Sequence, residues 1–414
     1  MRKRRIIPAF AAGASALLIA TGAARAGGQD FDQIEKGRYL ATAADCVACH
    51  TVPNGGMTFA GGRPIETPFG NITSPNITPD AETGIGSWTD EQFDDAVRKG
   101  VRPDGSRLYP AMPYTSYTKM SHDDVVAIRA YLNTVEPVRH PVVVNTLPFP
   151  FNIRASMRLW DALYFNPGEF RADLQKPPVW NRGAYLVQGP GHCTACHTPK
   201  SFLGGDRNGE YLRGSVLQGW FAPDITNDER VGLGQWSSDD IVAYLKTGHN
   251  RMTAATGPMA EEIMHSTSNM KDEDLAAIAA YLKSVPGSAD SPAPLSAGDP
   301  VMAAEQAIYR DQCAACHQID GKGVPQLFPS LAESSGVRSR DATTLIRVVL
   351  RGARSVATAR EPTAPGMPSF GRQLDDGQIA AVLSYVRGAW GRPAAAIAPD
   401  DVARMRDDLS GRAD

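Results

Sequence analysis

The sequence contains the pentapeptides CVACH (residues 46–50), CTACH (193–197) and CAACH (313–317), which together use all six cysteines of the chain. In each pentapeptide, two cysteines three positions apart are followed at once by histidine. Side chains at this spacing lie on one face of a helical turn. The pattern therefore presents two thiols and an imidazole together, and it does so three times, at intervals of 147 and 120 residues.

This arrangement is the attachment pattern of c-type haem. Each thiol can add to one vinyl group of haem, and the adjacent histidine is placed to become the proximal ligand of the iron. We therefore predict three covalently bound haem c groups. The predicted thioether cysteines are Cys46, Cys49, Cys193, Cys196, Cys313 and Cys316, and the predicted proximal ligands are His50, His197 and His317.

Other uses of cysteine fit this pattern less well. Three disulfides would suit an exported chain, but they do not require a histidine after each pair. A thioredoxin-like site would occur once and would not need that histidine either. A zinc ribbon places two such pairs roughly 15–20 residues apart. Three repeats that use every cysteine favour haem.

The sequence around the haem motifs also repeats. Tyr39 and Tyr185 occupy matching positions in GRYL (37–40) and GAYL (183–186), and Ile308-Tyr309 is the shorter equivalent before the third motif. Segments 74–100 and 222–248 both place a tryptophan before a Thr or Ser helix cap and end in glycine. The third unit lacks this tryptophan and the Asn-Ile-Thr loop. We expect an amphipathic helix to close each unit, at Ser121–Val135, Lys271–Val285 and Asp375–Gly388. A further amphipathic helix is expected inside the third unit, at Asp341–Arg351.

A methionine in a proline-containing loop is the candidate sixth iron ligand of each unit. The distance from His50 to Met112 is 62 residues, that from His197 to Met259 is also 62, and that from His317 to Met367 is 50. Proline disfavours helix, so such a loop can present a thioether to the iron. The local rivals of Met259 are Met252, Met264, His249 and His265. Histidine/methionine ligation raises the potential and leaves no open coordination position.

These patterns predict a mainly α protein built from three tandem cytochrome c domains. The domain-closing tyrosines Tyr131, Tyr281 and Tyr385 are expected to pack against the first helix of their units. The expected segments are a signal peptide (1–26), domain 1 (27–140), a linker with an amphipathic helix (141–177), domain 2 (178–286), a linker (287–300), domain 3 (301–392) and a charged tail (393–414), which is expected to be solvated and either helical or irregular.

The N-terminus predicts export. Residues 2–5 are basic, residues 6–22 are largely apolar, and Ala24-Arg25-Ala26 fits a small-x-small cleavage site. Because residues 1–26 hold five basic side chains and no acid, their removal changes the formal charge from −3 to −8. An acidic chain of this kind does not suit nucleic acid. We expect a periplasmic protein.

Beyond the haem motifs, the mature sequence resembles the three-haem cytochrome c subunits of bacterial membrane-bound alcohol, gluconate, sorbitol, fructose and aldehyde dehydrogenases. Segment 68–114, which ends in YPAMPY, and segment 180–201 carry the resemblance. It implies transfer of electrons from the cofactor of a catalytic dehydrogenase subunit (flavin, pyrroloquinoline quinone or molybdenum) to ubiquinone or another respiratory acceptor. In that family, the cysteines, histidines and methionines named above serve the haems. Nothing in this sequence indicates a flavin, nicotinamide or molybdenum site of its own, so we expect no independent substrate site.

The C-terminus departs from the family, whose members commonly reach the membrane through C-terminal segments. In the 141–177 linker, Ile153, Met157, Trp160 and Tyr164 recur at helical spacing. This stripe is either a surface for lipid, quinone or the dehydrogenase, or a connector packed between units one and two. The alternative functions are a multi-haem enzyme such as a peroxidase, a free electron shuttle and an oxidase subunit.

Overall fold

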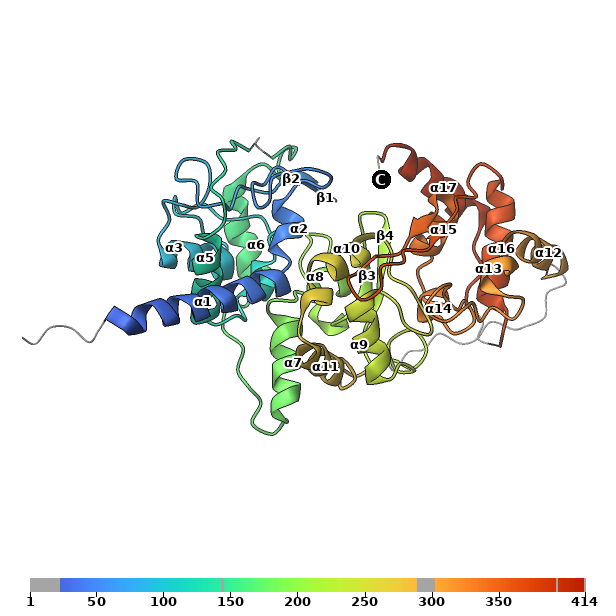
Figure 1. Ribbon diagram of the computed structural model, residues 1–414. Coiled ribbons are helices and arrows are strands. Elements are labelled where there is room, and N and C mark those ends of the chain that lie inside the picture. Colours follow the sequence, from blue (N-terminus) through green and yellow to red (C-terminus); the bar gives the residue numbers. More distant parts are fainter. Residues whose placement is uncertain (1–22, 143–144, 289–301, 392–393, 413–414) are drawn as a thin grey trace, which may run out of the picture.

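The computed structural model describes residues 23–142, 145–288, 302–391 and 394–412. Its helices form three units in a row, with the unit that contains α7 and α11 in the middle (Figure 1). The strands within the described residues form three separate two-stranded antiparallel hairpins. The expected mainly α fold is therefore confirmed. Most of the predicted signal peptide (1–26) and of the 287–300 linker lies outside the described residues.

The first unit contains the first haem motif at the end of a long helix. Its helices and strands are α1 (Ala23–Ala43), α2 (Cys46–His50), β1 (Pro64–Thr67), β2 (Gly70–Thr73), α3 (Asp90–Lys99), α4 (Tyr114–Tyr117) and α5 (His122–Leu132). The side chain of Thr89 caps α3 in a capping box with Gln92, and Gly100 ends α3 in the left-handed conformation. Ser121 caps α5. The predicted cap and stop residues therefore set the ends of these helices.

The second unit repeats this design. Its elements are α7 (Pro178–Gln188), α8 (Thr194–His197), η2 (Asn208–Glu210), β3 (Arg213–Leu217), β4 (Trp220–Asp224), α9 (Ser238–Thr247), α10 (Gly257–His265), η3 (Thr267–Asn269) and α11 (Asp272–Leu282). Ser237 and Asp240 form the capping box of α9, and Gly248 ends that helix with φ 81°. Because matching residues cap matching helices, the internal repeat of the sequence is also a repeat of structure.

A glycine permits the close crossing of the first and last helix in each of these units. A Cβ added to Gly37 on α1 would lie 1.8 Å from the backbone oxygen of Ala127 on α5. A Cβ added to Gly183 on α7 would lie 1.9 Å from the equivalent oxygen of Ala277 on α11. Backbones that approach so closely leave no room for a side chain. The two glycines therefore fix how α1 crosses α5 and how α7 crosses α11.

The closing tyrosines pack as expected in two units. Tyr281 lies with its ring centroid 5.2 Å from that of Trp180 on α7. Tyr385 lies 5.3 Å from Tyr309 on the first helix of the third unit. Tyr131 is only half buried, and its aromatic neighbour is Phe59 in a loop, 6.3 Å away.

The third unit ends in a helix that packs against its core. Its elements are α12 (Met302–Gln312), α13 (Ala314–His317), α14 (Ser335–Arg338), α15 (Thr343–Arg351), β5 (Ala353–Arg354), β6 (Gly366–Met367), α16 (Asp376–Gly388) and α17 (Pro399–Ser410). The prediction of a solvated tail is wrong for α17. Val402 and Leu409 are fully buried in a core shared with α15 and α16. Charged residues dominate the composition of α17, but its few apolar side chains lie on one face.

Units one and two meet through reciprocal hydrogen bonds. Tyr39 on α1 donates its hydroxyl to Asp274 on α11, and Tyr185 on α7 donates to Asp124 on α5. Within unit two, Arg182 on α7 donates two bonds of 2.7 Å to Asp274, which holds this carboxylate in place for Tyr39. Since Tyr39 matches Tyr185 in the repeat and Asp124 matches Asp274, the two units contact each other through equivalent surfaces.

Units two and three meet differently. The backbone of Phe221 on β4 exchanges two hydrogen bonds with the Thr344 hydroxyl on α15. The guanidinium of Arg347, also on α15, lies 4.5 Å from the ring centroid of Trp220. Arg338 donates to the carbonyl of Arg230 at 3.0 Å. The hairpin of unit two therefore docks on α15 of unit three.

Candidate haem-binding sites

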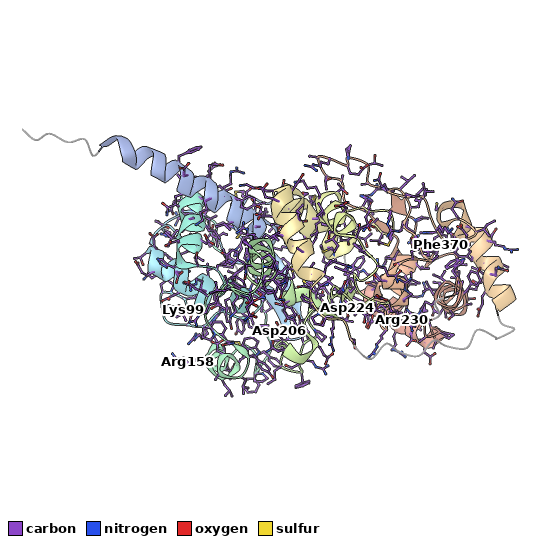
Figure 2. All side chains as sticks on the ribbon, turned by 90° about the horizontal axis from the view of Figure 1, so that it is seen from below. Lys99, Arg158, Asp206, Asp224, Arg230 and Phe370 are labelled. Atoms are coloured by element: carbon purple, nitrogen blue, oxygen red, sulfur yellow. The ribbon has the colours of Figure 1, made fainter. Side chains whose placement is uncertain are left out.

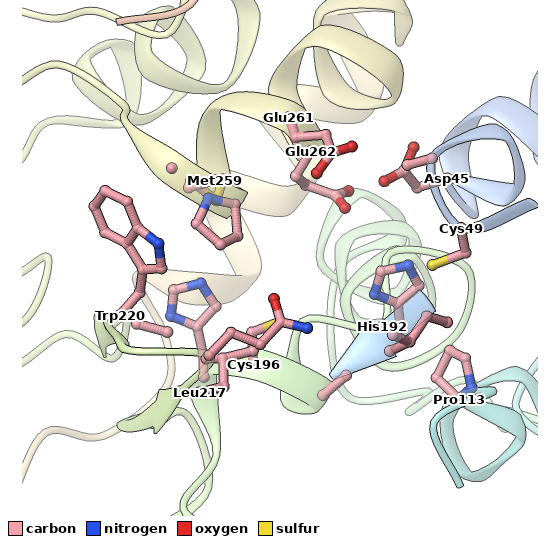
Figure 3. Close-up of a pocket in the computed structure, with 18 of the residues that line it drawn as sticks. Asp45, Cys49, Pro113, His192, Cys196, Leu217, Trp220, Met259, Glu261 and Glu262 are labelled. Atoms are coloured by element: carbon pink, nitrogen blue, oxygen red, sulfur yellow. The ribbon is translucent and has the colours of Figure 1, made fainter. Parts of the chain in front are cut away.

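A single continuous cavity of about 2730 Å³ runs through all three units. Pockets for ordinary small ligands occupy roughly 300–1,000 Å³, so this space suits several large groups. Its lining includes every predicted haem cysteine, histidine and methionine except Cys316, which is exposed. Figure 3 shows the part between units one and two, where Cys49 lies on one side and Cys196 with Met259 on the other. The fold thus brings the three CxxCH motifs to one interior space.

The three motif histidines share one hydrogen-bonding geometry. Nδ1 of His50 donates to the carbonyl of Pro75 at 2.7 Å, and Nδ1 of His197 donates to that of Pro223 at 2.7 Å. Nδ1 of His317 donates to the carbonyl of Pro329 at 3.0 Å. With the proton held at Nδ1, the Nε2 lone pair is left for a metal. Such a second partner is what orients a ligating imidazole.

The local sequence explains why a proline carbonyl stands at each of these places. Asn76 accepts hydrogen bonds from both the backbone and the hydroxyl of Thr78. Asp224 does the same for Thr226. Each of these tight turns begins at the residue directly after the proline, so it holds the carbonyl of that proline in place. The third unit reaches the same geometry with a shorter loop, because Pro329 follows its histidine by 12 residues.

The imidazoles are neutral at ordinary pH. Burial lowers the pKa of His50, His197 and His317 below the usual histidine value, and the carbonyl contacts only partly offset this. Burial also raises the pKa of the Cys46 thiol to about 12 and that of Cys196 to about 11. The motif histidines are therefore unprotonated at Nε2, as an iron ligand must be.

The predicted methionines line the cavity but differ in backbone. Met112 lies in a turn before α4, and Met367 lies in β6. The expectation of a loop is wrong for Met259, which lies in the first turn of α10. Pro258 explains this difference, since proline is well tolerated at the start of a helix. Among the rivals of Met259, only Met252 also lines the cavity.

A cluster of carboxyl groups, of which only that of Asp45 is buried, lies between the first two haem motifs. Glu261 and Glu262 point from α10 toward Asp45, which directly precedes Cys46 (Figure 3). Arg63 of unit one bonds Glu261 of unit two through both guanidinium Nη atoms. Asp45 is buried, and its Oδ1 has no hydrogen-bond partner among the described residues. Burial, followed by the charge of Glu262, raises the pKa of Asp45 well above its usual value.

This raised pKa predicts a pH-dependent stability. The folded chain keeps a proton on Asp45 that the unfolded chain releases above about pH 4. The contribution of Asp45 to the free energy of unfolding is therefore complete at acid pH and is lost as pH rises. We expect Asp45→Asn to be about 1–2 kcal/mol more stable than the wild type at pH 8 and equal to it near pH 4. Denaturant unfolding at both pH values measures this.

The control for Asp45→Asn is Asp407→Asn on the exposed face of α17. This substitution should leave the difference in free energy of unfolding between pH 8 and pH 4 at its wild-type value. An Asp45→Asn variant whose stability follows the wild-type pH profile would show that Asp45 is ionised in the folded chain.

The residues present suit covalent haem. The cavity is mainly apolar in its lining, and each unit contributes to it at least one motif thiol, an oriented imidazole and a thioether. Haem bound in this way supplies a one-electron iron couple. No helix within the described residues has the length and apolar character needed to cross a bilayer.

Comparison with known proteins agrees with this geometry. The sequence model of the family described as Cytochrome c matches three separate ranges, residues 34–136, 181–286 and 303–390. The chain belongs to the cytochrome c family. The matched ranges each contain one CxxCH motif, so this cytochrome has three haem c sites, formed by Cys46 and Cys49, Cys193 and Cys196, and Cys313 and Cys316.

Curated relatives match the cytochrome along nearly its whole length. The gluconate 2-dehydrogenase cytochrome c subunit of Pantoea cypripedii is 41% identical over 91% of this chain and 90% of its own. The cytochrome c subunit of alcohol dehydrogenase (quinone) from Gluconacetobacter polyoxogenes is 39% identical over 97% of this chain and 90% of its own. The fructose dehydrogenase cytochrome subunit of Gluconobacter japonicus is 40% identical over 90% and 82%. The resemblance inferred from the sequence is therefore confirmed, and the cytochrome is an electron-transfer protein.

Sequence reasoning missed the residues that orient the imidazoles. Pro75, Pro223 and Pro329 act through their carbonyls, which every residue type carries, so a search for reactive side chains passes over them. A weak signal was present. In each unit, the proline precedes a short polar residue and an aliphatic one, in PNI (75–77), PDI (223–225) and PSL (329–331).

Proposed function

We propose that this cytochrome is the electron-transfer subunit of a periplasmic, membrane-bound dehydrogenase complex. It would receive electrons from the flavin, pyrroloquinoline quinone or molybdenum cofactor of a catalytic subunit and deliver them to ubiquinone or another respiratory acceptor at the outer face of the inner membrane. The observation that carries the proposal is the near full-length similarity to cytochrome subunits of gluconate, alcohol and fructose dehydrogenases. The predicted export signal supports the compartment.

The cavity supports a relay role. A chain that passes single electrons between sites benefits when those sites share one interior space with little water. Here residues of all three units line the same cavity. We propose His50 with Met112, His197 with Met259, and His317 with Met367 as the axial ligand pairs. We also propose residues 27–140, 178–286 and 301–392 as the domains that carry them.

Purification of the tagged chain from membranes tests this function. We expect a catalytic dehydrogenase subunit to co-purify, identified by mass spectrometry and by a cofactor assay, and its substrate to reduce the haems of the complex. The untagged strain provides the control. Recovery of the haem protein alone after gentle solubilisation, with no substrate able to reduce it through a partner, would contradict the proposal.

A further inference from the structure

The linker helix presents an apolar face to solvent. After η1 (Arg154–Ser156), α6 (Met157–Tyr164) buries Trp160 and leaves Leu159 68% and Leu163 60% exposed. The stripe expected from the sequence thus packs inward at Trp160, which supports the packed-connector interpretation for that side. The outward side carries a second set of apolar residues that the sequence pattern did not single out.

The loop that precedes η1 and the loop that Trp160 contacts carry further exposed apolar side chains. Phe149 in the loop before η1 is 77% exposed, and Phe202 in the loop after α8 is 93% exposed. We call this surface the α6 patch; it comprises Phe149, Ile153, Leu159, Leu163, Phe202 and Leu203, all exposed. Exposed apolar side chains scattered singly are normal, but a cluster of this size on one face marks an interaction site.

The inner contacts of α6 hold the patch in place. The indole nitrogen of Trp160 donates to the carbonyl of Leu203 at 2.8 Å, which ties α6 to the loop that carries Phe202. Asp161 accepts a hydrogen bond of 2.7 Å from Tyr114. In the loop that precedes η1, the ring of Phe151 packs against that of Phe69 with their centroids 4.8 Å apart. The outer residues are therefore displayed by a fixed scaffold.

The charge around the patch differs in sign from that of the whole chain. In the fully described stretch 149–164, Arg158 is exposed and lies at the rim of the molecule (Figure 2). The acid of that stretch, Asp161, is buried and faces Arg107 at 3.3 Å. The rest of the mature chain is acidic. An apolar surface with a positive charge attracts an anionic lipid layer and repels a basic protein.

We propose that the α6 patch is a membrane-docking surface that inserts into the anionic headgroup layer of a phospholipid bilayer. This inference rests on the proposed function and names the surface by which it meets the membrane. Exposed phenyl groups on loops beside an amphipathic helix suit insertion into a lipid interface, whereas protein interfaces surround a packed core with a polar rim. Leu159, Leu163 and Phe202 also line the haem cavity, so docking places its first two sites beside the bilayer.

Vesicle sedimentation tests the surface. The probe is the mature three-haem chain with vesicles of phosphatidylethanolamine and phosphatidylglycerol, and with neutral phosphatidylcholine vesicles for comparison. We expect the wild type to bind the anionic vesicles more tightly, and Phe149→Ser/Ile153→Ser to lower the partition coefficient at least about tenfold. Phe202→Ser provides a second, independent variant, and because all three side chains are exposed, the fold should persist.

The matched control is Leu174→Ser/Ile319→Ser. These side chains are 96% and 69% exposed and lie outside the patch, so vesicle binding should stay at the wild-type value. A wild-type chain that does not sediment, or a patch variant that sediments as well as the control, would overturn the inference. A patch variant that binds vesicles normally but no longer co-purifies with a dehydrogenase would assign the surface to a protein partner and overturn it as well.

A separate readout distinguishes this inference from the proposed function. Reduction of the haems by the catalytic subunit and its substrate, measured in detergent solution, does not require membrane docking. The Phe149→Ser/Ile153→Ser variant, whose two residues do not line the haem cavity, should therefore be reduced at the wild-type rate there. Loss of vesicle binding by the variant with intact reduction supports both proposals, whereas failure of reduction in the wild type would remove the proposed function alone.

Discussion

Replacing Met259 by leucine is expected to lower the midpoint potential of one of the three haems by on the order of 0.1 V or more, within the roughly 0.8 V range that axial ligands set. Leucine conserves the volume of methionine but cannot donate to iron. The second haem should change from low to high spin and should then bind cyanide. Redox titration followed in the visible spectrum measures the shift.

Met252→Leu is the matched control, because Met252 lines the same cavity and receives the same substitution. Met252 belongs to the core of unit two, and its carbonyl accepts a hydrogen bond of 2.9 Å from Ser330. These are packing roles that leucine can fill. If the midpoint potential changes in Met252→Leu and stays constant in Met259→Leu, Met252 is the axial ligand and Met259 is the packing residue.

Gly183→Ala should destabilise the cytochrome by about 2 kcal/mol or more. A Cβ at this position would lie 1.9 Å from the oxygen of Ala277 and 2.9 Å from the Tyr281 side chain, so α7 and α11 must separate. Overpacking costs roughly 1–3 kcal/mol and occasionally more, which outweighs the gain of about 1 kcal/mol in helix propensity. Denaturant unfolding of the haem-loaded chain, followed by circular dichroism, measures the loss.

The helical control for this substitution is Gly336→Ala in α14. There the new Cβ would meet only the Ser334 hydroxyl, at 3.5 Å, which is an ordinary contact. The Gly336→Ala variant should be as stable as the wild type, or more stable by up to about 1 kcal/mol through the gain in helix propensity. Equal unfolding midpoints for Gly183→Ala and Gly336→Ala would mean that the crossing of α7 and α11 adjusts without cost.

The sequence contains the haem motifs and helix ends in a form that local rules can interpret. CxxCH is contiguous, and a cap such as Thr89 or Ser237 acts within its own helical turn, so both were predictable. The distance from His197 predicts Met259 as a ligand, and Met259 does line the cavity, but the prediction of a loop at this residue was wrong. The proline before it is compatible with either a loop or the first turn of a helix.

Features that depend on distant segments were not accessible in this way. The outward face of α6 becomes a patch only because loops 148–153 and 201–204 fold beside it. Likewise, the sequence of α17 is mostly charged, and its apolar side chains are buried only because α15 and α16 pack against them. In both cases tertiary contacts decide which side of a short helix meets water, and the periodicity of that helix alone does not contain this information.

The reciprocal tyrosine–aspartate bonds make the contact between the first two units equivalent to an isologous dimer interface within one polypeptide. The connecting segment between them then acts as a tether, which raises the effective concentration of each half near the other. A protease cut in the exposed loop at residues 166–169 would remove the tether and leave both symmetrical bonds intact. The two fragments should remain associated after such a nick, as a pair of subunits would.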